Sequence, residues 1–130
     1  MANLILTEVG WQDRIREKLG VDEAYLPDSA IDKPEVIGIA EANMVARIPT
    51  YASLEGASRL YLEVAVVLEA AALLCPTMKT RLPIREQALH FSRDLSVDWD
   101  KRRQELMNER DGILQAIDGV GFNKPILWVT

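Results

Sequence analysis

Cysteine and histidine occur only once each in this chain of 130 residues, as Cys75 and His90. One cysteine excludes an internal disulfide and a cysteine-based zinc site, and one histidine excludes most zinc sites and most histidine-based catalytic sets. The chain also lacks a glycine-rich phosphate loop, a G-x-S-x-G nucleophile elbow, and the H-E-x-x-H and C-x-x-C motifs. We therefore expect no metal, no cofactor and no enzymatic activity.

Positive charge is in the minority, because 15 Lys and Arg face 20 Asp and Glu and the formal net charge is −5. A protein that binds nucleic-acid phosphates along an open face usually has the opposite balance. General DNA or RNA binding is therefore disfavoured. The length and the 48% hydrophobic content fit one domain with a core of its own.

Long uncharged apolar runs are absent as well. The longest apolar tract, Leu60 to Cys75, has 16 residues and contains Glu63 and Glu69, whereas about 20 apolar residues are needed to cross a bilayer. We predict a buried helix there and no membrane partner. The first eight residues have no basic region before a short apolar run and no A-x-A cleavage motif, so an intracellular protein is expected.

Apolar residues recur at helical spacing in four stretches, and no strand-like region of similar length competes with them. The predicted fold class is all-α, a small bundle of about four helices. The first helix is expected over Glu8–Leu19, with Thr7 as its N-cap and Gly20 as its stop. The connector Val21–Lys33 contains Pro, Asp and Ser, which favour turns. The apolar face of the first helix is Trp11, Ile15 and Leu19.

The second helix is expected to begin near Pro34, which suits a first helical position, and to end before Pro49. Glu41 and Arg47 lie off its apolar face and should point to solvent or to a neighbour. The residues of that apolar face are Ile37, Ala40, Met44 and Ile48.

The third and last helices complete the predicted bundle. The third should be capped by Ser53 and end at Pro76, and because it is apolar nearly all round we predict that it is the central core helix. The last helix is expected over Asp98–Ile117, and its apolar stripe is interrupted by Arg103 and Arg110. That stripe consists of Trp99, Leu106, Ile113 and Ile117.

Two segments break the helical pattern. We predict a long loop or small hairpin over Thr77–Val97, which is either simply solvated or reaches an acidic partner, a neighbouring subunit or the DNA backbone. Its basic residues are Lys79, Arg81, Arg85 and Arg93. After a single helical domain over residues 1–118, residues 119–130 are predicted to form a C-terminal docking tail that follows the glycines Gly119 and Gly121. The tail ends in the apolar cluster Pro125, Ile126, Leu127, Trp128 and Val129, which must pack on its own domain or on a partner.

Two carboxylates, Glu63 and Glu69, lie inside the apolar third helix. A buried carboxylate must be paired, protonated or at an interface. We expect a partner in another subunit or in the same helix rather than a catalytic role, since structural networks also hold such groups. Arg103 and Arg110 are further candidates for contacts between subunits.

The elements follow one another in a distinctive order. The connector Leu26-Pro27-Asp28-Ser29-Ala30-Ile31 precedes a short helix, a core helix over Leu60–Cys75 that is rich in small residues, a long loop, and a charged helix over Trp99–Ile117 with a tail. From about Leu26 to the C-terminus this layout resembles that of the head–tail connector proteins of tailed phages, also called adaptors or head-completion proteins.

The resemblance implies a structural role. Members of that family are small α-helical proteins without enzymatic activity that form a ring, commonly of twelve copies, beneath the portal after DNA packaging. They extend the DNA channel and join the portal to a tail or stopper protein, and several dock their C-terminal segment into the portal. It implies a virion protein at the head–tail interface, assembled in the cytoplasm of a bacterial host, through which DNA passes without sequence-specific binding.

A different class of function is the alternative. A net negative chain suits a conduit for DNA, because a basic lining would hold the phosphates. A small helical regulatory protein that binds DNA or a protein partner would instead carry a recognition helix with a basic face. None of the predicted helices has such a face.

Overall fold

The computed structural model describes residues 3–81 and 98–117, and the regular structure in these two ranges is entirely helical. A π-helical turn, η1 (Pro34–Gly38), leads directly into one helix, and a 3-10 turn, η2 (Tyr51–Ser53), precedes another. The α-helices are α1 (Trp11–Leu19), α2 (Asp28–Ile31), α3 (Ile39–Arg47), α4 (Gly56–Arg81) and α6 (Trp99–Gln115). The prediction of a small all-α bundle is confirmed.

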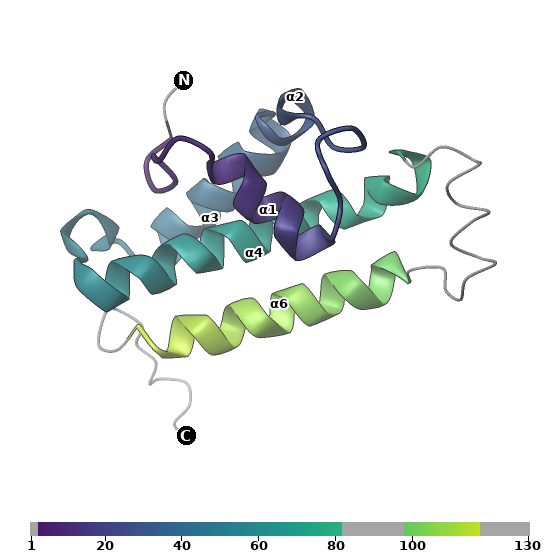
Figure 1. Cartoon of the computed structure of the whole chain (residues 1–130). Helices are drawn as coiled ribbons and strands as arrows, with labels where there is room; N and C mark the ends of the chain where they lie inside the picture. Colours follow the sequence, from purple (N-terminus) through teal and green to yellow (C-terminus); the bar gives the residue numbers. More distant parts are fainter. Residues whose placement is uncertain (1–2, 82–97, 118–130) are drawn as a thin grey trace.

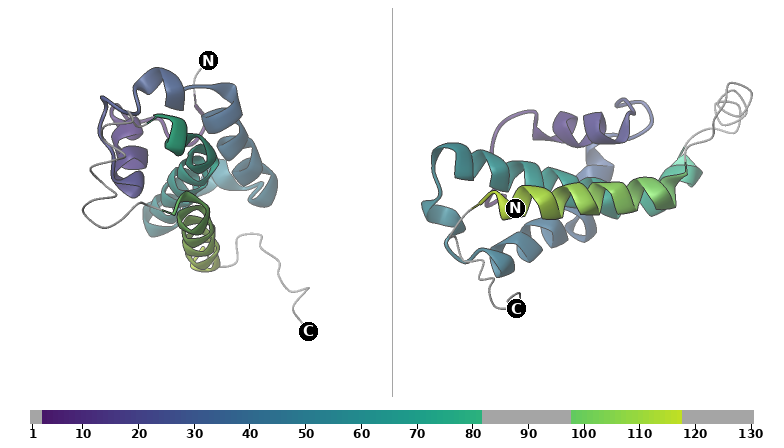
Figure 2. Two further views of the ribbon diagram at one scale, coloured as in Figure 1. Left: turned by 90° about the vertical axis from the view of Figure 1, so that its right-hand side faces the viewer. Right: turned by 90° about the horizontal axis from the view of Figure 1, so that it is seen from below.

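The longest helix, α4, lies at the centre of the arrangement (Figure 1). α6 runs antiparallel to α4 along one side, while α1, α3 and η1 pack against its other sides (Figure 2). Because α4 is covered in this way, most of its apolar side chains are fully buried, as predicted for the core helix. They include Leu62, Val66, Leu68, Ala71 and Met78.

One stretch of the described chain, Gly56–Met78 in α4, is long and apolar enough to cross a membrane by length and composition. The helix is thus longer than the apolar tract recognised in the sequence. In its most apolar part, 61% of the residues are buried inside the protein. The core helix of a bundle passes the same test, and α4 has that position here.

The C-terminal boundary predicted for α4 is wrong. Pro76 does not end the helix, which continues to Arg81, so the first residues assigned to the Thr77–Val97 loop are helical. A proline inside a helix removes one backbone hydrogen bond. Here the next turn buries Met78 in the core, and this packing outweighs the lost bond.

The N-terminal boundary of α4 also differs from the prediction. Ser53 lies in η2 rather than at the cap, and α4 begins at Gly56, whose φ of 62° is in the left-handed region. Tyr51 and Leu54 are half-buried against the core, and this packing holds the extra turn between the helices.

The boundaries of the first two helices are partly confirmed. α1 ends at Gly20 as predicted, with φ 73° and its N–H donating to the carbonyl of Arg16 at 2.8 Å. It begins later than predicted, because Gly10 with φ 90° is the N-cap and Thr7 lies outside the helix. The second helix begins at Pro34 and ends before Pro49, although its first turn is π-helical. The predicted apolar face of this second helix is buried throughout. On the predicted apolar face of α1, Ile15 and Leu19 are buried and Trp11 is half-buried.

A short helix inside the predicted connector was missed. Pro27 has extended backbone and acts as N-cap of α2, which begins with Asp28. A carboxylate at the first position of a helix interacts favourably with the free N–H groups. The composition of the connector, which favours turns, concealed this single helical turn.

The last helix matches its predicted range to within two residues. Asp98 is its N-cap and accepts the N–H of Lys101 at 3.1 Å, and the helix ends at Gln115. Three residues of the predicted stripe, Trp99, Leu106 and Ile117, are buried. The other predicted features lie outside the described residues: Gly119 and Gly121, Arg85 and Arg93, the tail cluster, and the side chains of Lys79 and Arg81.

Two leucines of α4 test its central position. Leu68→Ala is expected to lower the free energy of unfolding by about 2 to 5 kcal/mol, because it leaves a cavity where the side chain is 0% exposed. Leu60 is 54% exposed, so Leu60→Ala is the matched control and should change stability by about 0.5 kcal/mol or less. Urea denaturation measures both values. Equal losses would contradict the packing described here.

Candidate functional site

The side chain of Glu41 in α3 is turned into the protein, where the residue is 6% exposed. One carboxylate oxygen accepts the N–H of Leu4 at 2.7 Å, and the other accepts those of Ile5 at 2.9 Å and Leu6 at 2.8 Å. These three consecutive backbone donors lie outside any helix, so the carboxylate supplies the partner that burial requires. Of the two directions predicted for Glu41, the structure shows the neighbour, which is the N-terminal segment (residues 3–6).

Glu63 of α4 joins two other elements to the core helix. It accepts Nε of Arg59, one turn earlier, at 3.2 Å and Nη1 of Arg14 in α1 at 3.2 Å. The Nη2 of Arg59 also donates to the carbonyl oxygen of Ile5 at 2.8 Å. The N-terminal segment, α1 and α4 are therefore connected through one carboxylate and two guanidinium groups.

Glu69 makes the corresponding connection on the other flank of α4. Its side chain is 8% exposed and accepts Nη1 of Arg110 in α6 at 2.9 Å. The amide of Asn43 in α3 donates to its second oxygen at 2.5 Å. Arg110 also donates to Asp111 at 2.8 Å, and Arg47 lies 3.9 Å from the same carboxylate. Three helices thus share a polar network at the edge of the core.

Glu63 and Glu69 therefore have partners within their own chain, and one of these, Arg59, lies in the same helix as predicted. The predicted contacts of these residues, and of Arg103 and Arg110, with a second copy stay predictions. Arg103 is exposed on α6. It borders a shallow hollow of about 30 Å³ between α4 and α6, whose other lining residues are Glu69, Ala72, Leu73, Met107 and Arg110.

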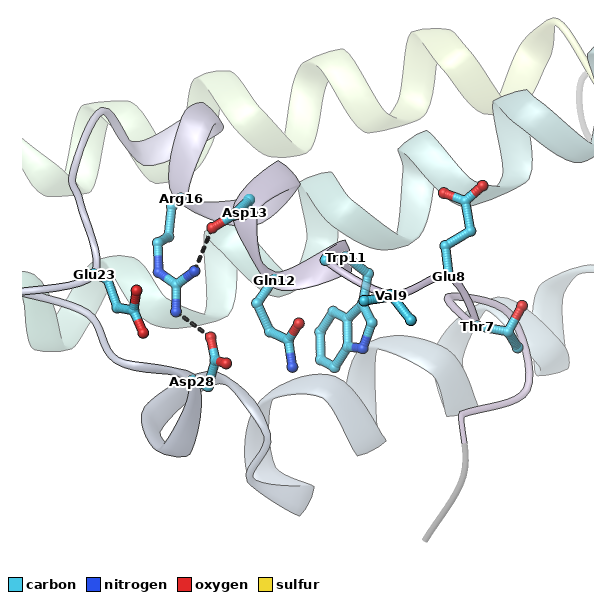
Figure 3. A pocket seen from close by; sticks show the side chains of 10 residues that line it. Thr7, Glu8, Val9, Trp11, Gln12, Asp13, Arg16, Glu23 and Asp28 are labelled. Carbon is cyan, nitrogen blue, oxygen red and sulfur yellow. Dashed lines mark hydrogen bonds and ion pairs between the residues drawn. The ribbon is translucent and has the colours of Figure 1, made fainter.

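Arg16 of α1 is a buried charge that the sequence analysis missed. The residue is 5% exposed, its Nε donates to the carbonyl oxygen of Leu26 at 2.7 Å, and its Nη1 donates to Asp13 at 2.5 Å. Its Nη2 donates to Asp28 at the start of α2 (Figure 3). The spacing of three residues from Asp13 was visible in the sequence, but the fold of the connector around Arg16 was not.

Their partners decide the charge states of Arg16, which is buried, and of Arg110, whose side chain is 11% exposed. Burial lowers the pKa of Arg16, but its hydrogen bonds to Asp28 and Asp13 outweigh burial and raise the pKa above its ordinary value. Burial also lowers the pKa of Arg110, but the neighbouring carboxylates of Asp111 and Glu69 outweigh burial and raise the pKa above its ordinary value. Both guanidinium groups are therefore permanently charged structural ties. Burial also raises the pKa of the Cys75 thiol to about 11, so it is a neutral core side chain at neutral pH.

An open groove of about 520 Å³ runs along the N-terminal half of α1 (Figure 3). Trp11 and Gln12 lie in its middle, and Val9 is at its rim. Its charged lining residues are Glu8, Asp13, Arg16, Glu23 and Asp28. A second hollow of about 440 Å³ shares Trp11 and Gln12 and extends the groove toward Asp32 and Ile37. The groove is shallow and predominantly acidic.

Several polar side chains of the groove are occupied by other side chains of the same chain. Asp13 and Asp28 are occupied by Arg16, and Gln12 donates to Asp32 at 3.1 Å. No group of three or more potential metal-binding side chains is found among residues 3–81 and 98–117. Three of the five charged side chains that line the groove, Asp13, Arg16 and Asp28, are thus paired with one another.

A comparison with protein-family models finds no match to this chain, and no curated protein or solved structure matches it either.

A conservative variant tests the role of Glu41. Glu41→Gln places an amide N–H₂ against backbone N–H donors, so a loss of about 1 to 3 kcal/mol in the free energy of unfolding is expected. Glu35 is exposed in η1, and Glu35→Gln is the matched control with an expected change of about 0.5 kcal/mol or less. Urea denaturation of both variants decides the point, and unchanged stability of Glu41→Gln would show that the three bonds are dispensable.

A double-mutant cycle tests the pair of Glu69 and Arg110. Either single change to Gln leaves the partner charge buried, so a loss of about 3 kcal/mol and a coupling of about 1 to 3 kcal/mol are expected. The control is the ion pair of Lys18 in α1 and Glu109 in α6, whose charged atoms lie 3.2 Å apart and whose side chains are far more accessible to solvent. This pair should couple by about 0.2 to 1 kcal/mol. Similar coupling in the two cycles would contradict the assignment of Arg110 as a buried tie.

Proposed function

We propose that the protein is a structural head–tail connector of a tailed phage or prophage. In this proposal it forms a ring between portal and tail, extends the DNA channel, and catalyses no reaction. The resemblance in the order of elements motivates the proposal, and the shape of the described chain supports it.

The observation that carries the proposal is the long hairpin of α4 and α6, in which the short helices pack around α4 and cover little of α6 (Figure 2). α6 packs mainly against α4 and also contacts α1 through Arg102 and Glu109, and the described residues leave much of its remaining surface uncovered. This uncovered surface is polar and charged, with Lys101, Arg103, Glu105 and Asn108. A helix of this kind suits side-by-side contact with other copies, because interfaces of assembling proteins combine a packed core with a polar rim.

The charge of the described helices also supports a conduit over a regulator. α6 carries four basic residues, Lys101, Arg102, Arg103 and Arg110, together with Asp100, Glu105, Glu109 and Asp111, so charges of both signs are mixed and the helix has no continuous basic face to place in a DNA groove. The net charge of −5 favours passage of DNA over retention. Arg16 and Arg110 form ion pairs with carboxylates of the same chain, and such internal pairs suit a protein with a structural role.

The tail supplies the attachment in this proposal. Burial of Ile126, Leu127 and Trp128 on a portal would contribute about 5 kcal/mol, at roughly 1.5 to 3 kcal/mol per side chain, before the ordering entropy of the tail is subtracted. Such a contact is modest for one chain. Repeated around a ring, it becomes a strong multivalent attachment.

Deletion of Lys124–Thr130 tests this function. The truncated protein should keep a thermal stability close to that of the full chain but no longer bind the portal protein of the same phage or prophage. The full chain should bind that portal in many copies, as measured by native mass spectrometry of the complex. If the full chain binds duplex DNA but does not bind the portal protein, the proposal is contradicted and the regulatory alternative is favoured.

A further inference from the structure

We propose that Val9 of one copy docks into the hollow between α4 and α6 of the next copy. This contact deepens the proposed function, because it rests on a ring and names the two surfaces that meet in it. We call residues 8–10 the knob, and the hollow lined by Leu73, Arg103 and Met107 the socket.

The knob is an apolar side chain that the described fold leaves uncovered. Val9 is 103% exposed and lies in the turn before α1, next to Gly10 with its left-handed φ of 90°. Leu4, Ile39 and Leu60 are the other large exposed apolar residues described, and they are 44 to 55% exposed. Val9 is thus the most exposed of these apolar side chains, and burial on a partner surface would remove the most apolar area from water there.

The socket has a complementary shape and composition. Its volume of about 30 Å³ is that of a dimple for one or two methyl groups, and Ala72, Leu73 and Met107 form its apolar wall. Leu73 and Met107 are half-buried and pack against the core, which holds their side chains in place. Arg103 stands at the rim and is exposed.

The charges around the two surfaces are opposite. The knob carries Glu8, whose side chain is 71% exposed, and the groove behind it is lined by Asp13, Glu23 and Asp28 with one basic residue, Arg16. The socket is lined by two basic residues, Arg103 and Arg110, and by one acidic residue, Glu69, and Arg103 is its exposed charge. Complementary charges of this kind select the partner surface and fix its orientation.

The two surfaces lie on opposite flanks of the hairpin, so one copy cannot occupy its own socket. On the α1 flank, the side chain of Lys18 pairs with Glu109. The backbone carbonyl oxygen of Lys18 accepts a hydrogen bond from the guanidinium group of Arg102 at 2.5 Å. On the α3 flank, Asn43 binds Glu69 beside the socket. A contact between unlike surfaces on opposite flanks is heterologous and generates a ring when its rotation closes.

Engineered cysteines test the contact directly. Val9→Cys mixed with Met107→Cys should give a disulfide-linked dimer under mild oxidation, and the double variant should give a ladder of higher species on denaturing gels. Neither single variant should crosslink to itself. The native Cys75 is buried and does not interfere. Leu60→Cys mixed with Met107→Cys is the matched control, since Leu60 is 54% exposed and belongs to neither surface.

A charge swap gives an independent readout of the same contact. Glu8→Lys and Arg103→Glu should each weaken self-association at least about tenfold in sedimentation experiments at low salt, and the combined variant should recover most of the loss. Glu17→Lys, on the exposed surface of α1 outside the groove, is the control. Both residues to be swapped are exposed, so the fold should tolerate the changes.

Each outcome decides the inference separately from the function. A parent protein that forms oligomers while the knob and socket cysteines fail to link, or a Val9→Cys variant that links to itself, overturns the contact but leaves the connector proposal standing. A parent that stays monomeric at all concentrations also overturns it. If the unmodified protein does not bind the portal, in contrast, the proposed function is overturned.

Discussion

The carboxylate of Glu41 fixes the start of the chain to the bundle, and the rest of the N-terminal half depends on this one group. It accepts three consecutive backbone N–H groups that no helix satisfies, which allows Ile5 and Leu6 to be buried without unpaired donors. Arg59 completes the attachment by binding the carbonyl oxygen of Ile5. The turn that follows this segment leads into α1, which packs along α4 and is bound to it by Arg14 and Glu63.

Glu63 and Glu69 extend the same principle to the two flanks of the core helix. An apolar helix such as α4 packs through contacts that have little direction, so apolar packing alone permits small rotations and slips. The carboxylates bind Arg14 of α1 on one flank and Arg110 of α6 on the other. Directional ion pairs at both flanks therefore set the register of a bundle whose stability comes from apolar burial.

The fold class, the four main helices and the central position of α4 could be predicted because they depend on hydrophobic periodicity, which is local in the sequence. Boundaries that depend on tertiary packing could not. Pro76 predicts a helix stop because the burial of Met78, two residues onward, is not visible in the sequence, and Thr7 predicts a cap because the turn at Gly10 depends on the attached N-terminal segment. Glu63 and Glu69 were correctly recognised as needing partners. The roles of Arg16 and Glu41 require backbone groups of Leu26 and of residues 4–6, and backbone acceptors and donors leave no mark in a sequence.

A rigid attachment of the N-terminal segment also matters for assembly, because it holds Val9 and the groove in a fixed place relative to α4 and α6. Native-state hydrogen exchange at Leu4, Ile5 and Leu6 tests this attachment most directly. The account predicts that these three amides, although outside any helix, are protected to an extent comparable with amides of the buried helices, and that Glu41→Gln removes the protection while α4 keeps its own. Exchange at the rate of an unfolded chain in the parent protein would contradict the account.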